Sequence, residues 1–145
     1  MLAALALRLQ GHPPLLLDLQ SSMDDDDHVV AVFKEDGLWG AISKTNHGVL
    51  RYREPVYLSL RELSMSYFHE YFLHDGRKTL RSYSTPLNLL RFDDRGWMTD
   101  EKDVWYIPKA LNAARHFALL TRSQIAKLRK ADKIEREMGK LTEWR

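Results

Sequence analysis

The segment HVVAVFKEDGLWGAIS, residues 28–43, decides the fold. Its first seven residues are mostly apolar and β-branched, which predicts a central strand over 28–34. Asp36–Gly37 is a strong signal for a tight hairpin turn, because these residue types tolerate positive φ. Residues 38–43 are therefore predicted to return as the neighbouring antiparallel strand.

The turn also fixes which side chains meet. A two-residue turn pairs Glu35 with Leu38 and, further along, Val30 with Ser43. His28 shares a strand face with Val30, so His28 and Ser43 become diagonal neighbours, about 7 Å apart between backbones. An imidazole beside a hydrogen-bonding group on rigid strands is half of a nucleophile, base and orienter arrangement. His28 and Ser43 are thus the candidate catalytic positions.

The expected fold class is α+β, with a small antiparallel sheet packed by an amphipathic helix over Ser59 to Asp75 and by a long C-terminal helix over 121–145. A capping box begins the first of these helices at Ser59. Residues 1–145 are predicted to form a single domain. The other elements expected are a helix at 2–10, strands at 15–19, 79–84 and 87–92, a short helix capped by Thr99, another opened by Pro108, and an ambiguous segment at 49–57 that Pro55 keeps from being a central strand.

Composition narrows the class of protein. The chain has 145 residues, 44% hydrophobic and 29% charged, which excludes a collagen-like, low-complexity or disordered protein. A formal net charge of +2 gives no whole-surface attraction to nucleic acid, so nucleic acid is not expected as a partner. The chain has no cysteine, which removes disulfides, cysteine-bound zinc and any thiol nucleophile from these residues.

No membrane span is expected. The longest apolar stretches, at 2–7 and 13–17, are much shorter than the roughly 20 residues that a spanning helix needs. No positively charged region precedes the first stretch, so it does not read as a signal peptide. We therefore predict a cytoplasmic protein.

Residues 1–46 combine short motifs in a particular order: an Ala- and Leu-rich helix, Gly-His-Pro-Pro at 11–14, the strand opened by His28, the Asp-Gly turn, and Leu-Trp-Gly-Ala-Ile-Ser-Lys-Thr at 38–45. This order resembles the transglutaminase-like branch of the papain-like cysteine enzymes. In that family a cysteine begins the helix, a histidine opens the next-but-one strand, and an aspartate lies in a Trp-x-x-x-Asp-x-Thr segment on the partner strand. By position, His28 corresponds to the histidine and Ser43 to the aspartate, while the cysteine has no counterpart.

The resemblance implies a papain/transglutaminase-like core and acyl transfer on an amide, in which His28 moves the proton of a thiol and an orienter fixes the ring. Residues 47–145 resemble bacterial proteins that carry such a domain. Because the cysteine is missing and Ser43 brings no negative charge, we predict that the chain is inactive as given. It is either a fragment of a cysteine-type enzyme, as its uncapped apolar start at Met1 indicates, or a degenerate relative that binds or scaffolds, as Ser43 indicates.

Other polar clusters carry simpler interpretations. The acidic run Asp24–Asp27 beside His28 could attract a hard cation such as calcium, but it lacks ligand spacing and is expected to be a solvated loop that raises the pKa of His28. No metal site and no cofactor is predicted. Aromatic residues at helical spacing over 67–72 are expected in the core. No pair of metal-ligating histidines is expected among the other histidines considered, which are His47, His69, His74 and His116.

The C-terminal stretch from Arg122 to Arg145 holds eight basic and four acidic residues. The alternative function is therefore a non-enzymatic protein-interaction module that uses a basic C-terminal helix. A homodimer is the other partner expected, because the leucines of the first helix would leave an apolar patch. These leucines are Leu2, Leu5, Leu7 and Leu9.

Overall fold

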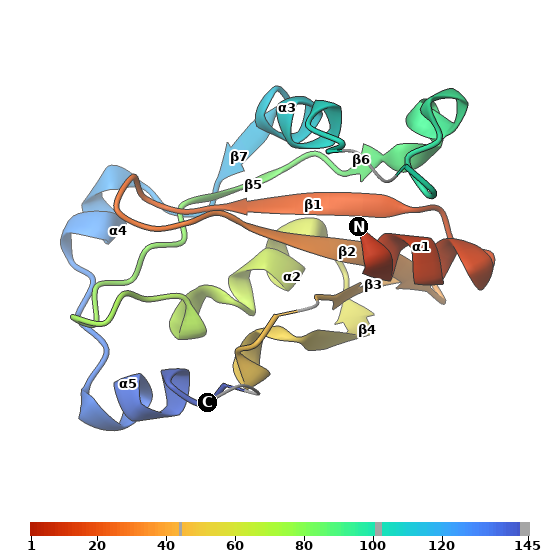
Figure 1. Cartoon of the computed structure of the whole chain (residues 1–145). Coiled ribbons are helices and arrows are strands. Elements are labelled where there is room, and N and C mark those ends of the chain that lie inside the picture. Colours follow the sequence, from red (N-terminus) through yellow and green to blue (C-terminus); the bar gives the residue numbers. More distant parts are fainter. Residues whose placement is uncertain (44, 101–102, 143–145) are drawn as a thin grey trace.

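The computed structural model describes residues 1–43, 45–100 and 103–142, which form an antiparallel sheet with short helices on both faces (Figure 1). The strands of these residues follow the order β4-β3-β2-β1-β5-β7, with β6 pairing with β1. The α+β class with an antiparallel sheet is confirmed. The strands are β1 Leu15–Gln20, β2 His28–Glu35, β3 Leu38–Ile42, β4 Tyr52–Tyr57, β5 Ser82–Ser84, β6 Leu87–Asn88 and β7 His116–Ala118.

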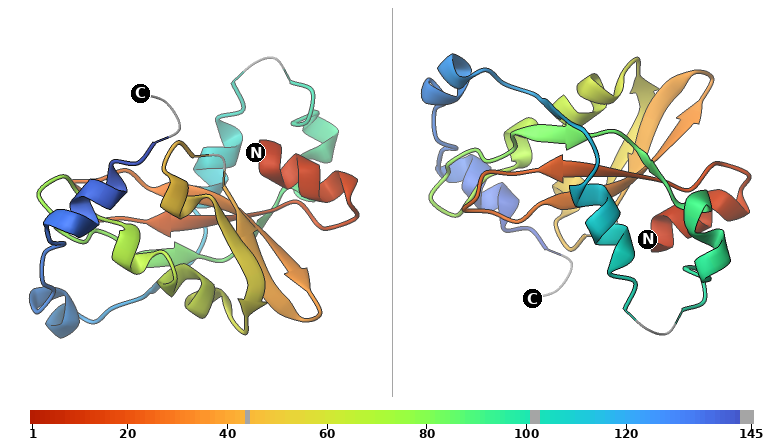
Figure 2. Two further views of the ribbon diagram at one scale, coloured as in Figure 1. Left: turned by 90° about the horizontal axis from the view of Figure 1, so that it is seen from below. Right: turned by 90° about the horizontal axis from the view of Figure 1, so that it is seen from above.

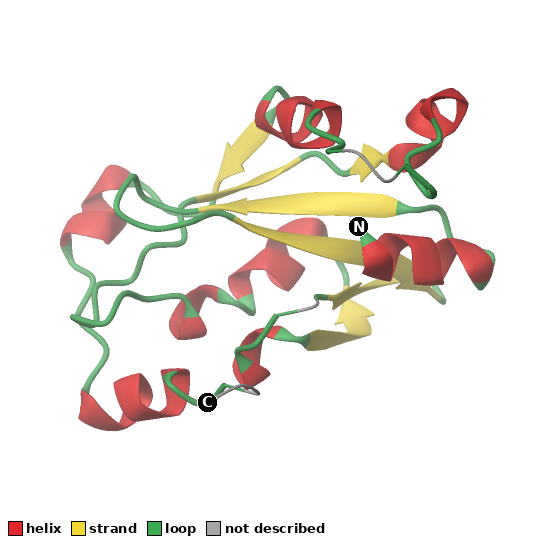
Figure 3. Cartoon of the chain, viewed as in Figure 1, coloured by secondary structure: helices red, strands yellow, loops and turns green. Residues whose placement is uncertain are grey.

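Short helices connect and cover these strands (Figure 3). Two of the predicted helices, at Ser59 to Asp75 and at 121–145, are longer than the helices that form, and 3₁₀ helices appear that were not predicted. The helices are α1 Leu2–Leu9, α2 Leu60–Met65, α3 Tyr106–Asn112, α4 Arg122–Ala126 and α5 Lys133–Gly139, with 3₁₀ helices η1 Gly48–Leu50, η2 Phe68–Glu70 and η3 Leu89–Arg95.

The β2–β3 hairpin forms in the predicted register. Glu35 pairs with Leu38, so the turn has two residues. Both turn residues adopt positive φ, 49° at Asp36 and 82° at Gly37, as a primed turn requires. Turn chemistry, which is local in the sequence, therefore sets the register of the whole hairpin.

The two faces of the sheet carry two separate cores. Leu16 and Ala31 pack with α1, η3 and α3 on one face, whereas Leu17 and Val30 pack with α2 and η2 on the other. Figure 2 shows these helices on opposite sides of the strands. Because His28 lies two residues before Val30, its side chain points to the α2 face and away from α1.

The edge strand β4 resolves the ambiguous segment. Pro55 lies within β4 and is tolerated because this strand is at the edge of the sheet, where a missing amide donor breaks no second ladder. The pairing with β3 shifts between Trp39 and Ala41, which marks a bulge.

The predicted helix from Ser59 to Asp75 is wrong in its extent. Ser59 caps α2 by accepting a hydrogen bond from the Glu62 amide at 3.2 Å, but α2 ends at Met65. The Ser64 hydroxyl donates to a carbonyl one turn back, and Ser66 does the same, which weakens the helical ladder there. The chain then continues as η2. The aromatic residues that follow α2 are buried as predicted at Tyr67, Phe68 and Tyr71, while Phe72 is half-buried.

The predicted long C-terminal helix is also wrong. Residues 127–132 separate α4 from α5, and Asp132 starts α5 with a capping box of its own. The Ala131 amide donates to the Gly76 carbonyl at 2.8 Å, which ties the break to the body of the protein. Apolar periodicity alone therefore overestimated the helix, because the cap and this tether interrupt it.

Smaller expectations differ as well. Only Ser82–Ser84 of the strand predicted at 79–84 is extended. The strand predicted at 87–92 stops at Asn88, because the Asn88 side chain accepts from the Leu90 amide and starts η3. The helix predicted to open at Pro108 begins at Tyr106. No helix begins at Thr99, which lies in a turn; residues 101–102, where that helix would have run, lie outside the described part of the chain.

The predicted apolar patch on α1 is only partly present. Leu2 and Leu9 are exposed, but Leu7 is buried and Leu5 is half-buried, because they face the sheet. Over the described residues, no helix is both long enough and apolar enough to cross a bilayer.

Candidate functional site

The hairpin brings together the two predicted site residues. His28 is the first residue of β2 and Ser43 follows the last residue of β3. The His28 Nε2 and Ser43 Oγ atoms are 2.7 Å apart, a hydrogen bond. Ser43 is only 6% exposed, and its own amide donates to the Arg51 carbonyl at 2.7 Å. Both partners are thus held by the sheet rather than by a free loop.

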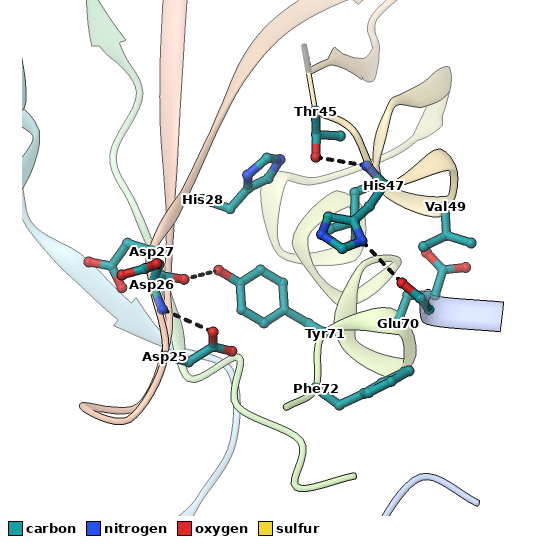
Figure 4. Close-up of a pocket in the computed structure, with 12 residues that line it drawn as sticks. Asp25, Asp26, Asp27, His28, Thr45, His47, Val49, Glu70, Tyr71 and Phe72 are labelled. Carbon is teal, nitrogen blue, oxygen red and sulfur yellow. Dashed lines mark hydrogen bonds between the residues drawn. The ribbon is translucent and has the colours of Figure 1, made fainter. Parts of the chain in front are cut away.

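His28 lines a cavity of about 260 Å³ on the α2 face (Figure 4). The Tyr71 ring lies beside His28, and its hydroxyl points to the acidic loop and donates to the Asp26 carbonyl (Figure 4). Among the described residues, the Nδ1 atom of His28 has no hydrogen-bond partner, whereas Nε2 is bonded to Ser43. The cavity is lined by Asp25, Asp26, Asp27, His28, Thr45, His47, Val49, Leu50, Glu70, Tyr71, Phe72 and Gly139.

Burial sets the charge state of His28. The pKa of His28 is lowered, first because burial disfavours the imidazolium and second because His47 is a like charge nearby. The predicted rise in pKa from the acidic loop is therefore wrong. The loop carboxylates are turned to other partners: Asp25 accepts from the Thr79 hydroxyl, and Asp27 accepts from the Ser21 amide at 2.8 Å. At neutral pH His28 is a neutral ring, able to accept a proton.

His47 is a second imidazole at this cavity that the sequence did not assign to a site. Its Nδ1 atom lies 3.1 Å from the carbonyl oxygen of Gly139, so Nδ1–H donates to that carbonyl. Figure 4 shows the rings of His28 and His47 on neighbouring sides of the cavity. His47 lies beyond the end of the hairpin, so the strand register, which is the signal that found Ser43, did not extend to it.

The helix α1, which the resemblance relates to the family's cysteine-bearing helix, does not pack on the His28 side of the sheet. The chain contains no cysteine. The packed side of α1 lies against the face opposite His28, although Met1 and Ser43 line a common cavity of about 260 Å³ at that end of the sheet. The described residues therefore place a histidine and a serine in hydrogen-bond contact, with no thiol beside them.

The acidic run has other contacts. Asp24 forms an ion pair with Arg77 at 2.6 Å, and the Asp25 and Asp27 carboxylates accept the hydrogen bonds described above. Within the ranges that the structure describes, no group of three or more histidine, aspartate or glutamate side chains is placed to hold a metal ion.

The other histidines lie apart from this cavity. His116 Nε2 lies 3.1 Å from the Asp18 carboxylate, a cross-strand pair that the sequence did not reveal. His69 Nδ1 accepts from the buried Lys78 ammonium at 3.1 Å. His74 is exposed. A scan against protein-family models and a search of curated proteins found no match to the chain.

Proposed function

We propose that the chain is a transglutaminase-like domain, with a papain/transglutaminase-like core, that has a base and an orienter but no nucleophile. The observation that supports this most strongly is the 2.7 Å hydrogen bond between His28 Nε2 and Ser43 Oγ on neighbouring strands. These are the two positions that the sequence motifs relate to the family's histidine and aspartate. In this proposal the cavity binds an amide-bearing group and does not turn it over.

The chemistry of the pair favours binding over catalysis. A neutral imidazole can take a proton from a thiol, but an imidazolium must then be stabilised. A carboxylate would do this by its charge, whereas the Ser43 hydroxyl only orients the ring. The low pKa of His28 adds to the difficulty, because the charged ring is disfavoured in this position.

The Ser43 hydroxyl is itself a poor candidate for the nucleophile. It contacts a neutral imidazole, which is the geometry of a serine and its base. However, Ser43 is buried, and no carboxylate among the described residues bonds the other nitrogen of His28 to support the charged ring. We therefore assign Ser43 the orienting position.

The test combines turnover with ligand contact. N-acetylglutamine amide is added at millimolar concentration, ammonia release is measured, and the imidazole signals of His28 are followed by NMR. We expect no ammonia and concentration-dependent changes at the imidazoles of His28 and His47, both at the cavity, and we expect His28→Ala to abolish the change at His47. The matched control is His12→Ala, which removes a ring that packs edge to face against Phe33 outside the cavity and should leave the change at His28 intact.

Two outcomes would contradict the proposal. Ammonia release that His28→Ala abolishes would show an active enzyme with a nucleophile that the proposal denies. No change at His28 over the whole titration would show that the cavity does not take an amide.

The second candidate function is a protein-interaction module. The continuous basic helix is absent, but α5 exposes Ile134 to 81% beside basic residues. Retention on heparin that collapses at modest salt, and weakens in a Lys133→Glu/Arg136→Glu variant, would support an anionic partner for this surface. A cytoplasmic location and a homodimer remain predictions alongside this candidate.

A further inference from the structure

The C-terminal residues 133–142, here called the strap, lie along the mouth of the His28 cavity. Thr142 pairs with His47 in an antiparallel bridge, and the Gly48 amide donates to the Leu141 carbonyl at 3.4 Å. The Gly139 carbonyl accepts from His47, and Gly139 packs so closely on the Phe72 ring that a Cβ there would lie 2.9 Å from it. The strap thus forms part of the cavity wall.

The strap also contributes Gly139 to the walls of two cavities. A second cavity, of about 380 Å³, lies beside the 260 Å³ cavity of His28. The residues that line both are Asp25, His47, Phe72 and Gly139. Movement of Gly139 away from His47 and Phe72 would therefore join the two spaces and widen the access to His28.

The strap is held weakly compared with the sheet. No residue of α5 is buried, and Ile134 and Leu141 are exposed. The bonds to His47 and Gly48 are near the surface, where water can replace them when they break. By contrast, the Ala131 amide anchors the chain to Gly76 just before the strap begins, so the strap can swing from a fixed point.

We propose that residues 133–142 act as an autoinhibitory strap that shields His28 and opens by release of the contacts to His47 and Gly48. Opening exposes the Nδ1 side of the His28 ring to ligands too large for the closed cavity. The inference rests on the proposed function in taking His28 as the group that a ligand must reach.

A reversible lock tests the strap directly. His47→Cys/Thr142→Cys places two thiols at partner positions of an antiparallel bridge, where disulfide geometry is accessible, and the native chain offers no competing cysteine. Each form is treated with diethyl pyrocarbonate, which acylates neutral imidazoles, and peptide mass spectrometry follows His28. We expect modification of His28 to be about fivefold or more slower in the oxidised form than in the reduced form, because locking removes the open population.

The oxidised and reduced forms of the double variant both lack the His47 imidazole, so its loss does not affect the comparison. Thr142→Cys alone serves as the control that cannot form the disulfide. Equal rates for His28 in the two forms would overturn the strap. A parallel change at His12, on the other face of the sheet, would overturn it as well, because it would indicate general loosening.

A second measurement uses the unmodified chain, in case the double variant does not fold. Hydrogen exchange should show protection of the Gly48 amide that is about 100-fold or more below that of the hairpin amide of Val32, reflecting local opening. Equal protection at the two amides, or no protection at Gly48, would contradict the strap. Failure of amide binding with a working lock would instead count against the proposed function alone, and the reverse result against the strap alone.

Discussion

Two imidazoles bridge strands of the same sheet, and they differ in what they meet. His28 contacts the Ser43 hydroxyl at 2.7 Å, whereas His116 contacts the Asp18 carboxylate at 3.1 Å. Both oxygen-bearing partners are buried, Ser43 at 6% and Asp18 at 2% exposure. The environments are therefore similar, and the chemical nature of the partner is the main difference.

The His116–Asp18 pair must hold one proton more than the His28–Ser43 pair. His116 Nδ1 donates to the Ala114 carbonyl at 2.9 Å, so the bond from Nε2 to Asp18 requires a further proton, shared between ring and carboxyl. The pKa of Asp18 is raised by burial, and the hydrogen bond from His116 opposes that rise. His28 has one bonded nitrogen and stays neutral. Both ring nitrogens of His116 are hydrogen-bonded within the fold, whereas His28 keeps one nitrogen that can bond to a ligand.

The largest effect is expected from a substitution that breaks the His116–Asp18 pair. His116→Phe leaves Asp18 buried without its imidazole and should cost about 3 kcal/mol of unfolding free energy at neutral pH. The variant raises the folded-state pKa of Asp18 further above its unfolded value, so stability is lost as pH rises between the two, and the cost should be smaller at pH 4.5 than at pH 7.5. Urea unfolding at both pH values measures it.

The control for this substitution is His74→Phe, at an exposed histidine, which should change stability by less than about 0.5 kcal/mol. A loss for His116→Phe that is the same at the two pH values would mean that Asp18 is not the group left unpaired.

The next largest effect is expected from a substitution that breaks the His28–Ser43 hydrogen bond. Ser43→Ala removes a neutral hydrogen bond from a buried position and should cost about 1 kcal/mol, roughly a third of the effect at His116. Chemical denaturation measures the change, and Ser123→Ala on the exposed surface of α4 is the matched control. A cost as large as that of His116→Phe would show that the His28–Ser43 pair carries a charge and that the contrast between the two pairs is wrong.

A third, smaller effect is the pH dependence that His28 contributes. Its folded-state pKa lies below the unfolded value of about 6.5, so the unfolded chain takes the proton first as pH falls. The stability that neutral His28 contributes is complete above about pH 6.5 and is lost as pH falls through the folded pKa. His28→Gln should therefore lose less stability than the native chain between pH 7.5 and pH 5, and comparing the urea titrations of the two chains cancels the opposite contribution of Asp18.

The part of the fold that could be predicted is the part decided locally. The Asp36–Gly37 turn and the apolar alternation on either side of it set a register that brings His28 to Ser43, fifteen residues away. By contrast, His116 and Asp18 are 98 residues apart and meet only because β5 lies between β1 and β7. No spacing in the sequence encodes that pairing, which depends on how the whole sheet packs.

The helices after α2 could not be predicted in extent for a related reason. Apolar periodicity marked the buried face around Tyr67, but it does not register side chains that compete with the helical ladder. Ser64 and Ser66 end α2 early, and Asp132 starts a new helix. His47 lies at the candidate site because a loop and the strap hold it there. Neither segment produces a periodic pattern of apolar residues in the sequence.

The smallest expected effect concerns an exposed carboxylate near the His28 ring. The question is whether Asp26 influences the charge of His28 as Asp18 influences that of His116. Asp26 lies beside the His28 cavity, but its side chain is exposed, so water and salt screen its charge. Asp26→Asn should therefore leave the pKa of His28 nearly unchanged, whereas His47→Ala should raise it by removing a like charge. NMR titration of the His28 ring measures both variants. A fall of about 0.5 or more in Asp26→Asn would show that proximity alone, without burial or a hydrogen bond, lets a carboxylate set the charge of this imidazole.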